Sequence, residues 1–415
     1  MTVGTNSLVT GPDYRAFCQE RLQDPYPLLR RLRTEDPVHW CEPMKLWVVT
    51  RYADVDAGLR DPRFSSDRSD MYAQALPPDL KAAVQPLLDH LSKWIQYTDD
   101  PDHGRLRKLV NQAFTPKVLA ALRPRIGTLV EELLGRLPRG KRFDIIEGFC
   151  APLPATVICE MIGVPVAERD RFRQATARVT KFSTRGGPAL KEHAADAHAA
   201  VGEIVAMFER LVEERRRAPR DDLLSALVSA EADGESLANE ELYAMCVFLF
   251  FAGHDTTTHG IASGLLALLR NPGQWGKLKS NPEPLVGAAV EEALRYESPV
   301  PRAVRRARET VAMGGREIPA GSIVVFLLSA ANRDPERFSN PERFDIERQP
   351  NRHLAFSFGR HFCLGAMLAR IEMEIAFRAF ARRLPDLQLG GEELKWRPTM
   401  GIRGLEALPV IIPSR

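Results

Sequence analysis

The sequence has few cysteines, and their spacing forms neither a metal-binding nor a disulfide framework. No C-x-x-C pair occurs, so the spacing predicts no zinc site and no set of disulfides. Scattered cysteines are typical of a reducing compartment, and we expect the protein to be cytoplasmic. The six cysteines are Cys18, Cys41, Cys150, Cys159, Cys246 and Cys363.

Long hydrophobic runs are also missing. The most apolar stretch, Leu242–Gly253, spans about twelve residues, whereas a helix needs roughly 20 apolar residues to cross a bilayer. The first residues, Met1–Leu8, lack the basic and apolar regions of a secretory signal. We therefore expect neither membrane association nor export, and Leu242–Gly253 is predicted to be a buried helix.

A strong charge of one sign is absent as well. The 57 Lys plus Arg are balanced by 54 Asp plus Glu, which leaves a net charge of +3. The densest basic cluster has no interleaved aromatic residues and matches no nucleic-acid-binding motif, so we expect no nucleic-acid partner. This cluster consists of Arg302, Arg305, Arg306 and Arg308.

What the sequence does contain is extensive helical periodicity. Apolar residues recur at helical spacing over residues 102–269 and again over 364–381. No Ser- or Gly-rich linker and no long repeat divides the chain. The predicted fold is mainly α with small β regions, and we expect residues 1–20 to form a loosely ordered N-terminus. The β-rich runs predict a hairpin from Val38–Trp40 and Leu46–Val49, and a turn at Gly314–Gly315 between Val311–Met313 and Ser322–Leu327. They also predict a final strand at Leu405–Ile412.

Two segments, Phe64–Thr98 and Thr180–Ala197, show the weakest periodicity and are predicted to be irregular. Long loops of this kind in a helical chain often control the access of a substrate. Ordinary surface loops fit the same pattern equally well.

The strongest chemical signal is Cys363, which follows Gly359 and precedes Gly365 at the start of a predicted helix. A helix N-terminus stabilises a thiolate through its dipole and its free N–H groups, so Cys363 is a candidate metal ligand. The glycines would let the backbone approach a flat cofactor. The alternative is a buried structural thiol, which is our interpretation of three other cysteines: Cys150, Cys159 and Cys246.

The pattern Phe356-x-x-Gly359-x-x-x-Cys363-x-Gly365 resembles the haem-binding loop of the cytochrome P450 enzymes, particularly the soluble bacterial members. By this resemblance Cys363 is the thiolate ligand of the iron of haem b. The resemblance also implies a single cytochrome P450 haem domain over residues 1–415, with haem between a long distal helix and the helix after the cysteine loop. Ser357 occupies a position where glycine is common, a departure that we expect to matter little.

The apolar helix around residue 250 changes character at Ala252-Gly253-His254-Asp255-Thr256. The small residues would let this helix lie against a cofactor, and Asp255 with Thr256 would supply a proton relay. A helix end with capping side chains is the alternative from the residues alone. The resemblance matches Ala252 to the haem contact and Asp255-Thr256 to the family's catalytic acid–threonine pair.

Two further sets of charged residues match the family pattern. Glu292 and Arg295 lie three residues apart, which alone predicts only a solvated ion pair; the resemblance makes them a buried structural cluster with Arg343. Haem carries two propionates, and buried carboxylates require cationic donors. The resemblance assigns this role to four residues: His103, Arg107, Arg305 and His361.

The resemblance implies a monooxygenase that receives electrons from an NAD(P)H-dependent ferredoxin reductase through a ferredoxin, activates O2, and hydroxylates or epoxidises a hydrophobic small molecule. We expect a monomer, and a basic face of Arg105, Lys108 and Arg360 for the acidic ferredoxin. A fatty acid, terpenoid, steroid or polyketide-like substrate fits. The residues matched to the substrate pocket are Phe248, Phe251, Ala252, Pro301, Ala303, Met400 and Ile402.

Two other functions stay open. One is a haem-thiolate enzyme that uses peroxide or works without O2, against which Thr256 argues because such an enzyme needs no proton relay. The other is a non-catalytic haem-binding or sensor protein, against which the Asp255-Thr256 pair argues.

Overall fold

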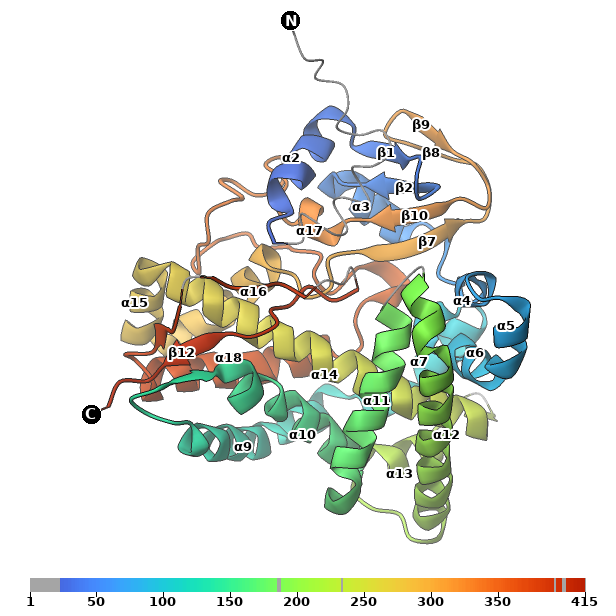
Figure 1. Cartoon of the computed structure of the whole chain (residues 1–415), viewed down its shortest axis with the longest axis horizontal. Helices are drawn as coiled ribbons and strands as arrows, with labels where there is room; N and C mark the ends of the chain where they lie inside the picture. Colours follow the sequence, from blue (N-terminus) through green and yellow to red (C-terminus); the bar gives the residue numbers. More distant parts are fainter. Residues whose placement is uncertain (1–22, 185–187, 233, 392, 398–400, 415) are drawn as a thin grey trace, which may run out of the picture.

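The computed structural model describes residues 23–184, 188–232, 234–391, 393–397 and 401–414. The prediction of a loosely ordered N-terminus at 1–20 and the predicted pocket residue Met400 lie outside these ranges. Helices make up most of the described chain, and the larger sheet lies to one side of them (Figure 1). The prediction of a mainly α fold with small β regions is confirmed.

The larger sheet has five strands in the order β1-β2-β10-β7-β3. The predicted hairpin forms it at one edge, with β1 antiparallel to β2, and β10 joins β2 in parallel. The Gly314–Gly315 turn connects β8 to β9, not to β10. The strands of these two sheets are β1 (Val38–Cys41), β2 (Leu46–Val49), β3 (Phe64–Ser65), β7 (Ala303–Ala307), β8 (Val311–Met313), β9 (Arg316–Ile318) and β10 (Ile323–Phe326).

The two faces of the larger sheet are covered by different helices. On one face Val55 and Leu59 of α3 (Tyr52–Arg60) and Leu328 of α17 (Leu328–Ala331) form an apolar cluster with Phe326. On the other face α2 (Tyr26–Glu35) buries its leucines. Side chains alternate along a strand, so neighbouring residues of β7 point to opposite faces.

The long helix α14 (Asn239–Arg270) crosses the helical part of the molecule (Figure 1). It packs against α10 (Pro152–Ile162), α16 (Pro282–Tyr296) and α18 (Ala366–Arg383). A Cβ on Gly264 would lie 2.5 Å from the Phe377 ring of α18, so glycine lets these two helices approach closely. Residues 242–253 are part of α14, as the apolar run predicts.

The prediction that Thr180–Ala197 is irregular is wrong. Helix α11 (Arg169–Thr184) and helix α12 (Pro188–Arg217) cover the described part of this segment. Much of the buried side of α12 is alanine, for example Ala194 and Ala197, whose weak hydrophobicity hides the helical period in the sequence. Phe64–Thr98 also contains short helices: α4 (Asp70–Gln74), α5 (Pro78–Ala83), α6 (Gln85–Ser92) and the 3₁₀ turn η1 (Ile95–Tyr97).

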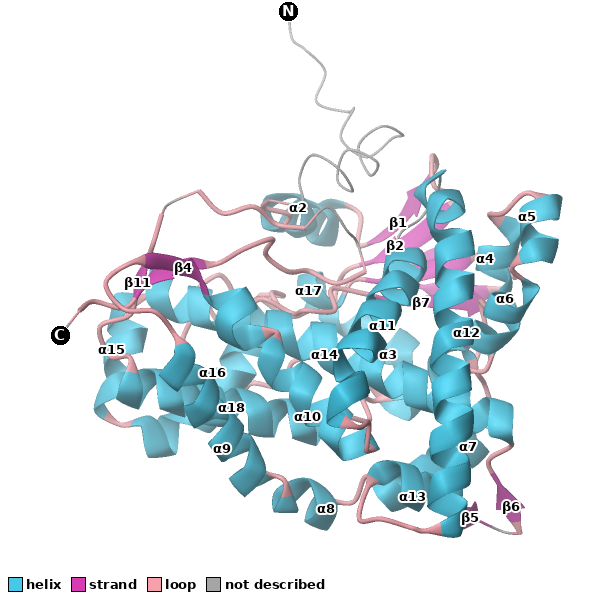
Figure 2. Ribbon diagram, turned by 60° about the horizontal axis from the view of Figure 1, so that its bottom comes forward, coloured by secondary structure: helices cyan, strands magenta, loops and turns pink. Residues whose placement is uncertain are grey.

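A second sheet, in the order β11-β12-β4, lies across the helical part from the larger one (Figure 2). The predicted C-terminal strand is shorter than expected, because only Pro409–Ile411 pairs as β12. Within the described ranges, no helix has both the length and the apolar composition that a bilayer span requires. The other elements are α7 (Asp102–Ala113), α8 (Pro116–Ala121), α9 (Arg123–Arg136), β4 (Arg142–Asp144), the π turn η2 (Ile146–Cys150), η3 (Val166–Glu168), α13 (Leu223–Val228), β5 (Glu231–Ala232), β6 (Glu235–Ser236), α15 (Pro272–Ser280), η4 (Gly359–His361) and β11 (Gln388–Leu389).

Candidate functional site

The segment before α18 folds back on itself and brings Cys363 to the start of that helix. The Cys363 N–H donates to the Phe356 carbonyl at 3.0 Å, and the Phe362 N–H donates to the Gly359 carbonyl at 3.0 Å. Gly359 has φ +72°, and a Cβ there would lie 2.7 Å from the Leu59 carbonyl of α3. Only glycine therefore fits this contact between the loop and α3. Ser357 also has a positive φ, +60°, which explains why glycine suits that position.

Cys363 has surroundings that differ from those of the cysteines interpreted as structural. Cys150, Cys159 and Cys246 are fully or almost fully buried, and burial raises the pKa of Cys159 to about 12. Cys363 is partly exposed. Burial raises its pKa, whereas the Gly365 N–H and the charges of Arg107 and Arg370 lower it. A thiolate at this position thus has a backbone donor and two cations to stabilise it.

A cluster of basic groups lies next to the cysteine loop. Nδ1 of His103 lies 3.9 Å from Asp100, whereas Arg305 has no ion-pair partner within the described part of the chain. The rings of His103 and His361 are 4.1 Å apart. Burial, together with Arg305 and His103, lowers the pKa of His361 to about 2. Arg305 is 6% exposed, and burial together with Arg68 lowers its pKa to about 10. Among the described residues, its polar contact is a hydrogen bond that Nη1 donates to the Val304 carbonyl at 2.9 Å.

Asp99, whose charge acts on Arg305, is already bound to other groups. It accepts from the hydroxyl of Ser65, from the N–H of Ser66 and from Nη2 of Arg308 at 2.7 Å. A buried guanidinium without an acid partner is costly, so the cluster suits a ligand that brings its own carboxylates. The propionates of a haem have this chemistry. Arg107 lies at the other side of the loop, where Nη1 donates to the Phe362 carbonyl at 2.8 Å.

On α14, the structure brings Thr256 and Asp255 into different surroundings. The Thr256 hydroxyl donates to the Ala252 carbonyl at 2.6 Å. The Asp255 carboxylate accepts from Nη1 of Arg397 at 2.9 and 3.0 Å and lies 3.4 Å from Nε2 of His259. Burial raises the pKa of Asp255, but His259 and Arg397 outweigh it and hold that pKa well below its usual range.

Sequence reasoning missed Arg397 and His259. His259 lies four residues after Asp255, on the same face of α14, and this spacing was available as a signal. Arg397 lies 142 residues from Asp255. No local pattern connects them, so only the tertiary structure reveals this pair.

The structural ion cluster contains a different arginine from the one predicted. Glu292 and Arg295 are fully buried and joined by hydrogen bonds of 2.7 and 2.8 Å, as the resemblance implies. The third side chain is Arg348, whose Nε lies 3.1 Å from Glu292. Arg343 is a correction: its side chain is 64% exposed, and only its carbonyl joins the cluster, by accepting from Arg295 and Arg348.

The matched pocket residues are placed by three parts of the chain. Phe248 and Phe251 of α14 contact the fully buried Trp94, at ring distances of 5.6 and 4.8 Å. Trp94 was not predicted. Ala303 is in β7, two residues from Arg305 and therefore on the same face of that strand. Pro301 precedes β7, and Ile402 is buried near the C-terminal end.

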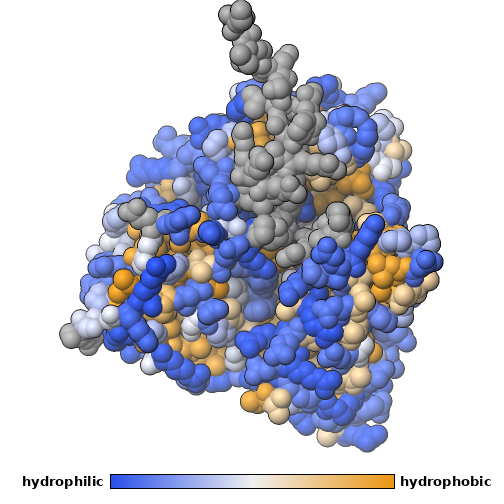
Figure 3. Space-filling view, in the orientation of Figure 1, coloured by the Kyte–Doolittle hydropathy of each residue, from blue (hydrophilic) through white to orange (hydrophobic). Residues whose placement is uncertain are grey.

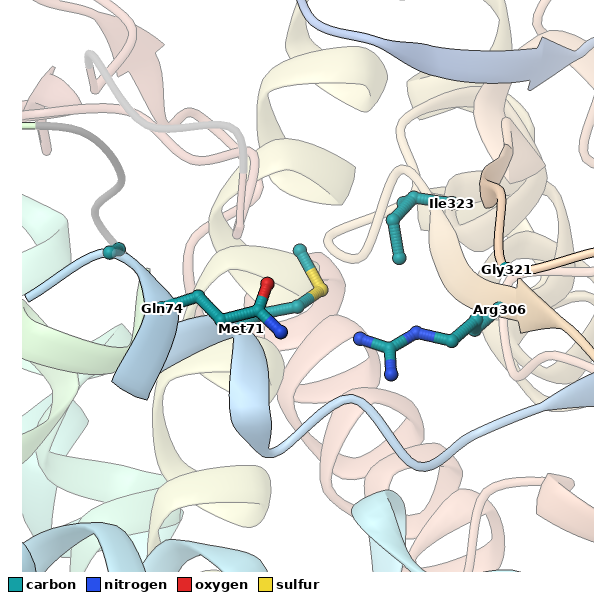
Figure 4. Close-up of a pocket in the computed structure, with 6 residues that line it drawn as sticks. Met71, Gln74, Arg306, Gly321 and Ile323 are labelled. Carbon is teal, nitrogen blue, oxygen red and sulfur yellow. The ribbon is translucent and has the colours of Figure 1, made fainter.

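A separate surface pocket of about 570 Å³ lies between α4 and the neighbouring strands β7 and β10 (Figure 4). Met71 and Gln74 line one side, and Arg306 and Ile323 line the other. Arg306 is bound to Asp70 at 2.6 Å. Since Arg306 follows Arg305 in β7, this pocket lies across the strand from the cation cluster.

Comparison with known proteins gives concordant matches. A family model described as "Cytochrome P450" matches residues 78–384. The chain is 39% identical to "Polyketide biosynthesis cytochrome P450 PksS" of Bacillus subtilis (strain 168), over 93% of this chain and 95% of that protein. It is 41% identical to "Cytochrome P450 monooxygenase PikC" of Streptomyces venezuelae, over 98% and 95%. The structure of P450BioI in complex with hexadec-9Z-enoic acid ligated acyl carrier protein is similar, with a TM-score of 0.87, 37% identity and coverage of 95% and 99%.

Proposed function

Because the chain belongs to the cytochrome P450 family and is a haem-dependent monooxygenase, we propose that the whole chain acts as one domain that binds haem b through Cys363. The observation that carries this proposal is the partly exposed Cys363 thiol near the charges of Arg107 and Arg370, together with the buried Arg305, which has no acid partner among the described residues. When bound, the haem supplies the iron at which O2 is reduced and one oxygen atom is transferred to the substrate.

We assign the protein's contributions to named groups. The Cys363 thiolate is the ligand, and the Gly365 N–H and Arg107 stabilise its negative charge. His103, His361 and Arg305 bind the haem carboxylates, which supply the anionic partner that Arg305 lacks. Phe356 and Gly359 shape the loop, and Ala252 lets α14 lie close to the distal side.

Thr256 is our candidate for holding a proton donor on the distal side. Its hydroxyl hydrogen is engaged with the Ala252 carbonyl, so the Oγ1 lone pairs are available to accept from a water molecule. Asp255 is the neighbouring acid that supplies protons to this water. A positioned acid–base element contributes typically about 10²–10⁴-fold to a rate.

We propose a hydrophobic fatty acyl or polyketide-like substrate. The aromatic rings of Phe248, Phe251 and Trp94 form an apolar wall next to α14. One similar protein, PksS, is named a polyketide biosynthesis cytochrome P450. Another, P450BioI, was solved in complex with an acyl carrier protein that bears hexadec-9Z-enoic acid. The pocket beside α4 in Figure 4 has apolar Met71 and Ile323 next to polar Gln74 and Arg306, which suits the passage of an amphiphilic molecule.

We propose a ferredoxin, reduced by an NAD(P)H-dependent reductase, as the electron donor. The rings of Phe358 and Phe362 are 36% and 38% exposed in the cysteine loop. Arg60 stacks on Phe358, and Arg360 projects nearby with an ion pair to Asp100. Exposed aromatic rings with cations form a docking surface for an acidic partner. Arg105, expected to contribute to this face, is bound to Glu241.

A test of this function compares Thr256→Ala with Thr258→Ala. Thr258 is buried two residues further along α14 and donates to the His254 carbonyl, so it is a matched control. NAD(P)H oxidation, hydrogen peroxide and product are measured together with a surrogate ferredoxin and a substrate found by haem absorbance. Thr256→Ala should still oxidise NAD(P)H, but its electrons should mainly reduce O2 to hydrogen peroxide, whereas Thr258→Ala should keep NAD(P)H oxidation coupled to product formation. Full coupling in Thr256→Ala, or product formation with peroxide alone, would favour the non-O2 enzyme.

A further inference from the structure

Asp255, Arg397 and His259 form a closed set of contacts that the proposed function does not explain. Nη1 of Arg397 reaches both oxygens of Asp255, at 2.9 and 3.0 Å. The same Nη1 lies 2.6 Å from Nε2 of His259. Nε2 of His259 in turn lies 3.4 Å from Oδ1 of Asp255. Each side chain of this triad therefore contacts the other two.

Packing holds the His259 ring in the triad. The side chain is 3% exposed. The ring packs directly against Gly404, where a Cβ would lie 2.2 Å from Cγ of His259. Any side chain at residue 404 would therefore clash with the ring. Nδ1 is buried and has no hydrogen-bond partner among the described residues. Nε2 is thus the edge of the ring through which His259 acts on its neighbours.

The protonation state of His259 decides which neighbour it can serve. A guanidinium only donates, so Nε2 accepts from Arg397 when His259 is neutral with its hydrogen on Nδ1. When Nε2 takes up a proton, it becomes a donor, and the imidazolium and guanidinium repel each other. The Asp255 carboxylate is then the available acceptor. Nε2 can therefore accept from Arg397 or donate to Asp255, but it cannot do both at the same time.

We propose that His259 is a positioning residue that controls which partner binds Asp255. When Nε2 of His259 takes up a proton, the Asp255 carboxylate exchanges its hydrogen bonds from Arg397 for one from His259. This exchange lets a proton reach the Asp255–Thr256 pair. The inference rests on the proposed function. While Arg397 binds Asp255, neither partner carries a transferable proton, because a guanidinium does not deprotonate in proteins. A His259 imidazolium next to Asp255, by contrast, carries a proton on Nε2 that it can donate. The proton comes from solvent and binds Nε2. It then passes to Oδ1, which leaves His259 neutral and Asp255 protonated, and no other covalent bond changes.

The groups that face His259 are few in the described chain. Asp255 and His254 are on its own helix, and Arg397 comes from the C-terminal region. Gly404 adds only backbone. His254 serves as a matched control, because its ring packs on Phe250 at 5.3 Å and its Nε2 has no described partner.

The first test measures the titration of His259 directly. The holoenzyme, labelled with ¹⁵N-histidine and reduced under carbon monoxide so that it is diamagnetic, is titrated by NMR. The signal missing from His259→Gln identifies His259. We expect the midpoint of its pH-dependent shift to be lower in Asp255→Asn, which removes the neighbouring anion, and higher in Arg397→Gln, which removes the neighbouring cation. A His259 signal that does not change with pH, or a midpoint that neither variant moves, would overturn the proposal.

The second test measures NAD(P)H oxidation by the substrate-free enzyme against pH. The parent rate should fall as pH rises through the His259 midpoint, and His259→Gln should lose most of this slope, whereas His254→Gln should keep it. If the rate depends on pH equally in the parent and in His259→Gln, the role proposed for His259 is wrong, while the proposed function of the enzyme is unaffected. A parent that lacks both thiolate ligation and NAD(P)H oxidation would instead contradict the proposed function.

Discussion

Two charged side chains in the core, Glu292 and Arg295, are fully buried, and each is hydrogen-bonded to several partners. Arg295 donates to the carboxylate and to the carbonyls of Asn332 and Pro341. Glu292 also accepts from the Asp345 N–H at 2.8 Å and from Arg348. These bonds tie α16 to residues 332–348, the segment that leads into the cysteine loop. A buried ion pair of this kind positions the loop more than it stabilises the fold.

Replacing Arg348 should therefore be far more damaging than replacing Arg343. Arg348→Leu leaves part of the buried Glu292 charge without a partner and should lower the free energy of unfolding by about 3 kcal/mol. Arg343→Leu removes an exposed side chain and should change it by less than about 0.5 kcal/mol. Urea unfolding of the two variants measures the difference. Equal losses would return Arg343 to the cluster.

At the scale of elements, β7 separates two sites by its alternation. Arg305 points to the cation cluster next to the cysteine loop, and Arg306 points to Asp70 and the surface pocket. The two arginines are chemically identical neighbours with different surroundings. They form a matched pair for testing which face of the strand binds the haem carboxylates.

Arg305→Leu should release haem faster, because a hydrogen bond to a charged group contributes about 1.5–3 kcal/mol, which is roughly a 10- to 100-fold change at about 1.4 kcal/mol per tenfold. Arg306→Leu should leave the rate close to that of the parent. Transfer of haem to apomyoglobin measures both. Unchanged loss from Arg305→Leu would remove Arg305 from the haem contacts.

Local sequence patterns predicted which segments form helices and strands better than they predicted which of these segments pack or pair together. The β1–β2 hairpin and α14 follow from alternation and an apolar run, which are local properties. The parallel pairing of β10 with β2 joins residues far apart in sequence, and no local pattern specifies it. The helix α12 escaped prediction because alanine carries its buried face.

The candidate site was predictable where its residues form motifs. Cys363, Gly359 and the Asp255-Thr256 pair are short patterns with a chemical reason. Arg348 and Arg397 belong to no such motif, because the acid that each one binds is 56 and 142 residues away in the sequence, respectively. The exchange of Arg343 for Arg348 shows this limit: both lie in the same segment, and only packing decides which side chain points inward.

At the scale of the whole molecule, His90 makes stability depend on pH. Burial and Lys93 lower its pKa from 6.5 to about 4, so it is neutral in the folded state at pH 5. The unfolded chain takes up a proton at this residue below about pH 6.5, and this proton uptake favours unfolding. Its contribution to stability is therefore complete above pH 6.5 and is lost as pH falls towards 4.

His90→Leu should flatten this dependence. From the two pKa values, His90 accounts for a loss of about 2 kcal/mol in the free energy of unfolding between pH 7 and pH 5. Urea unfolding of the parent and the variant at both pH values measures the difference. A parent and variant that lose the same free energy would show that His90 is charged in the folded state.

The surface of the molecule is mostly hydrophilic on the face shown in Figure 3, with apolar side chains in small separate groups. Among the described cysteines, one thiol differs from the others in its exposure. Cys363 is partly exposed beside cations, and Cys150 is fully buried. Haem ligation by Cys363 is the central claim, and Cys150 provides its control.

The most direct test is the absorption spectrum of the reduced carbon monoxide complex of the parent, Cys363→Ala and Cys150→Ser. The parent and Cys150→Ser should both show the band of a thiolate-ligated haem, and Cys363→Ala should lose it completely. A thiolate-type band in Cys363→Ala, or its absence from the parent, would contradict the claim that Cys363 is the ligand.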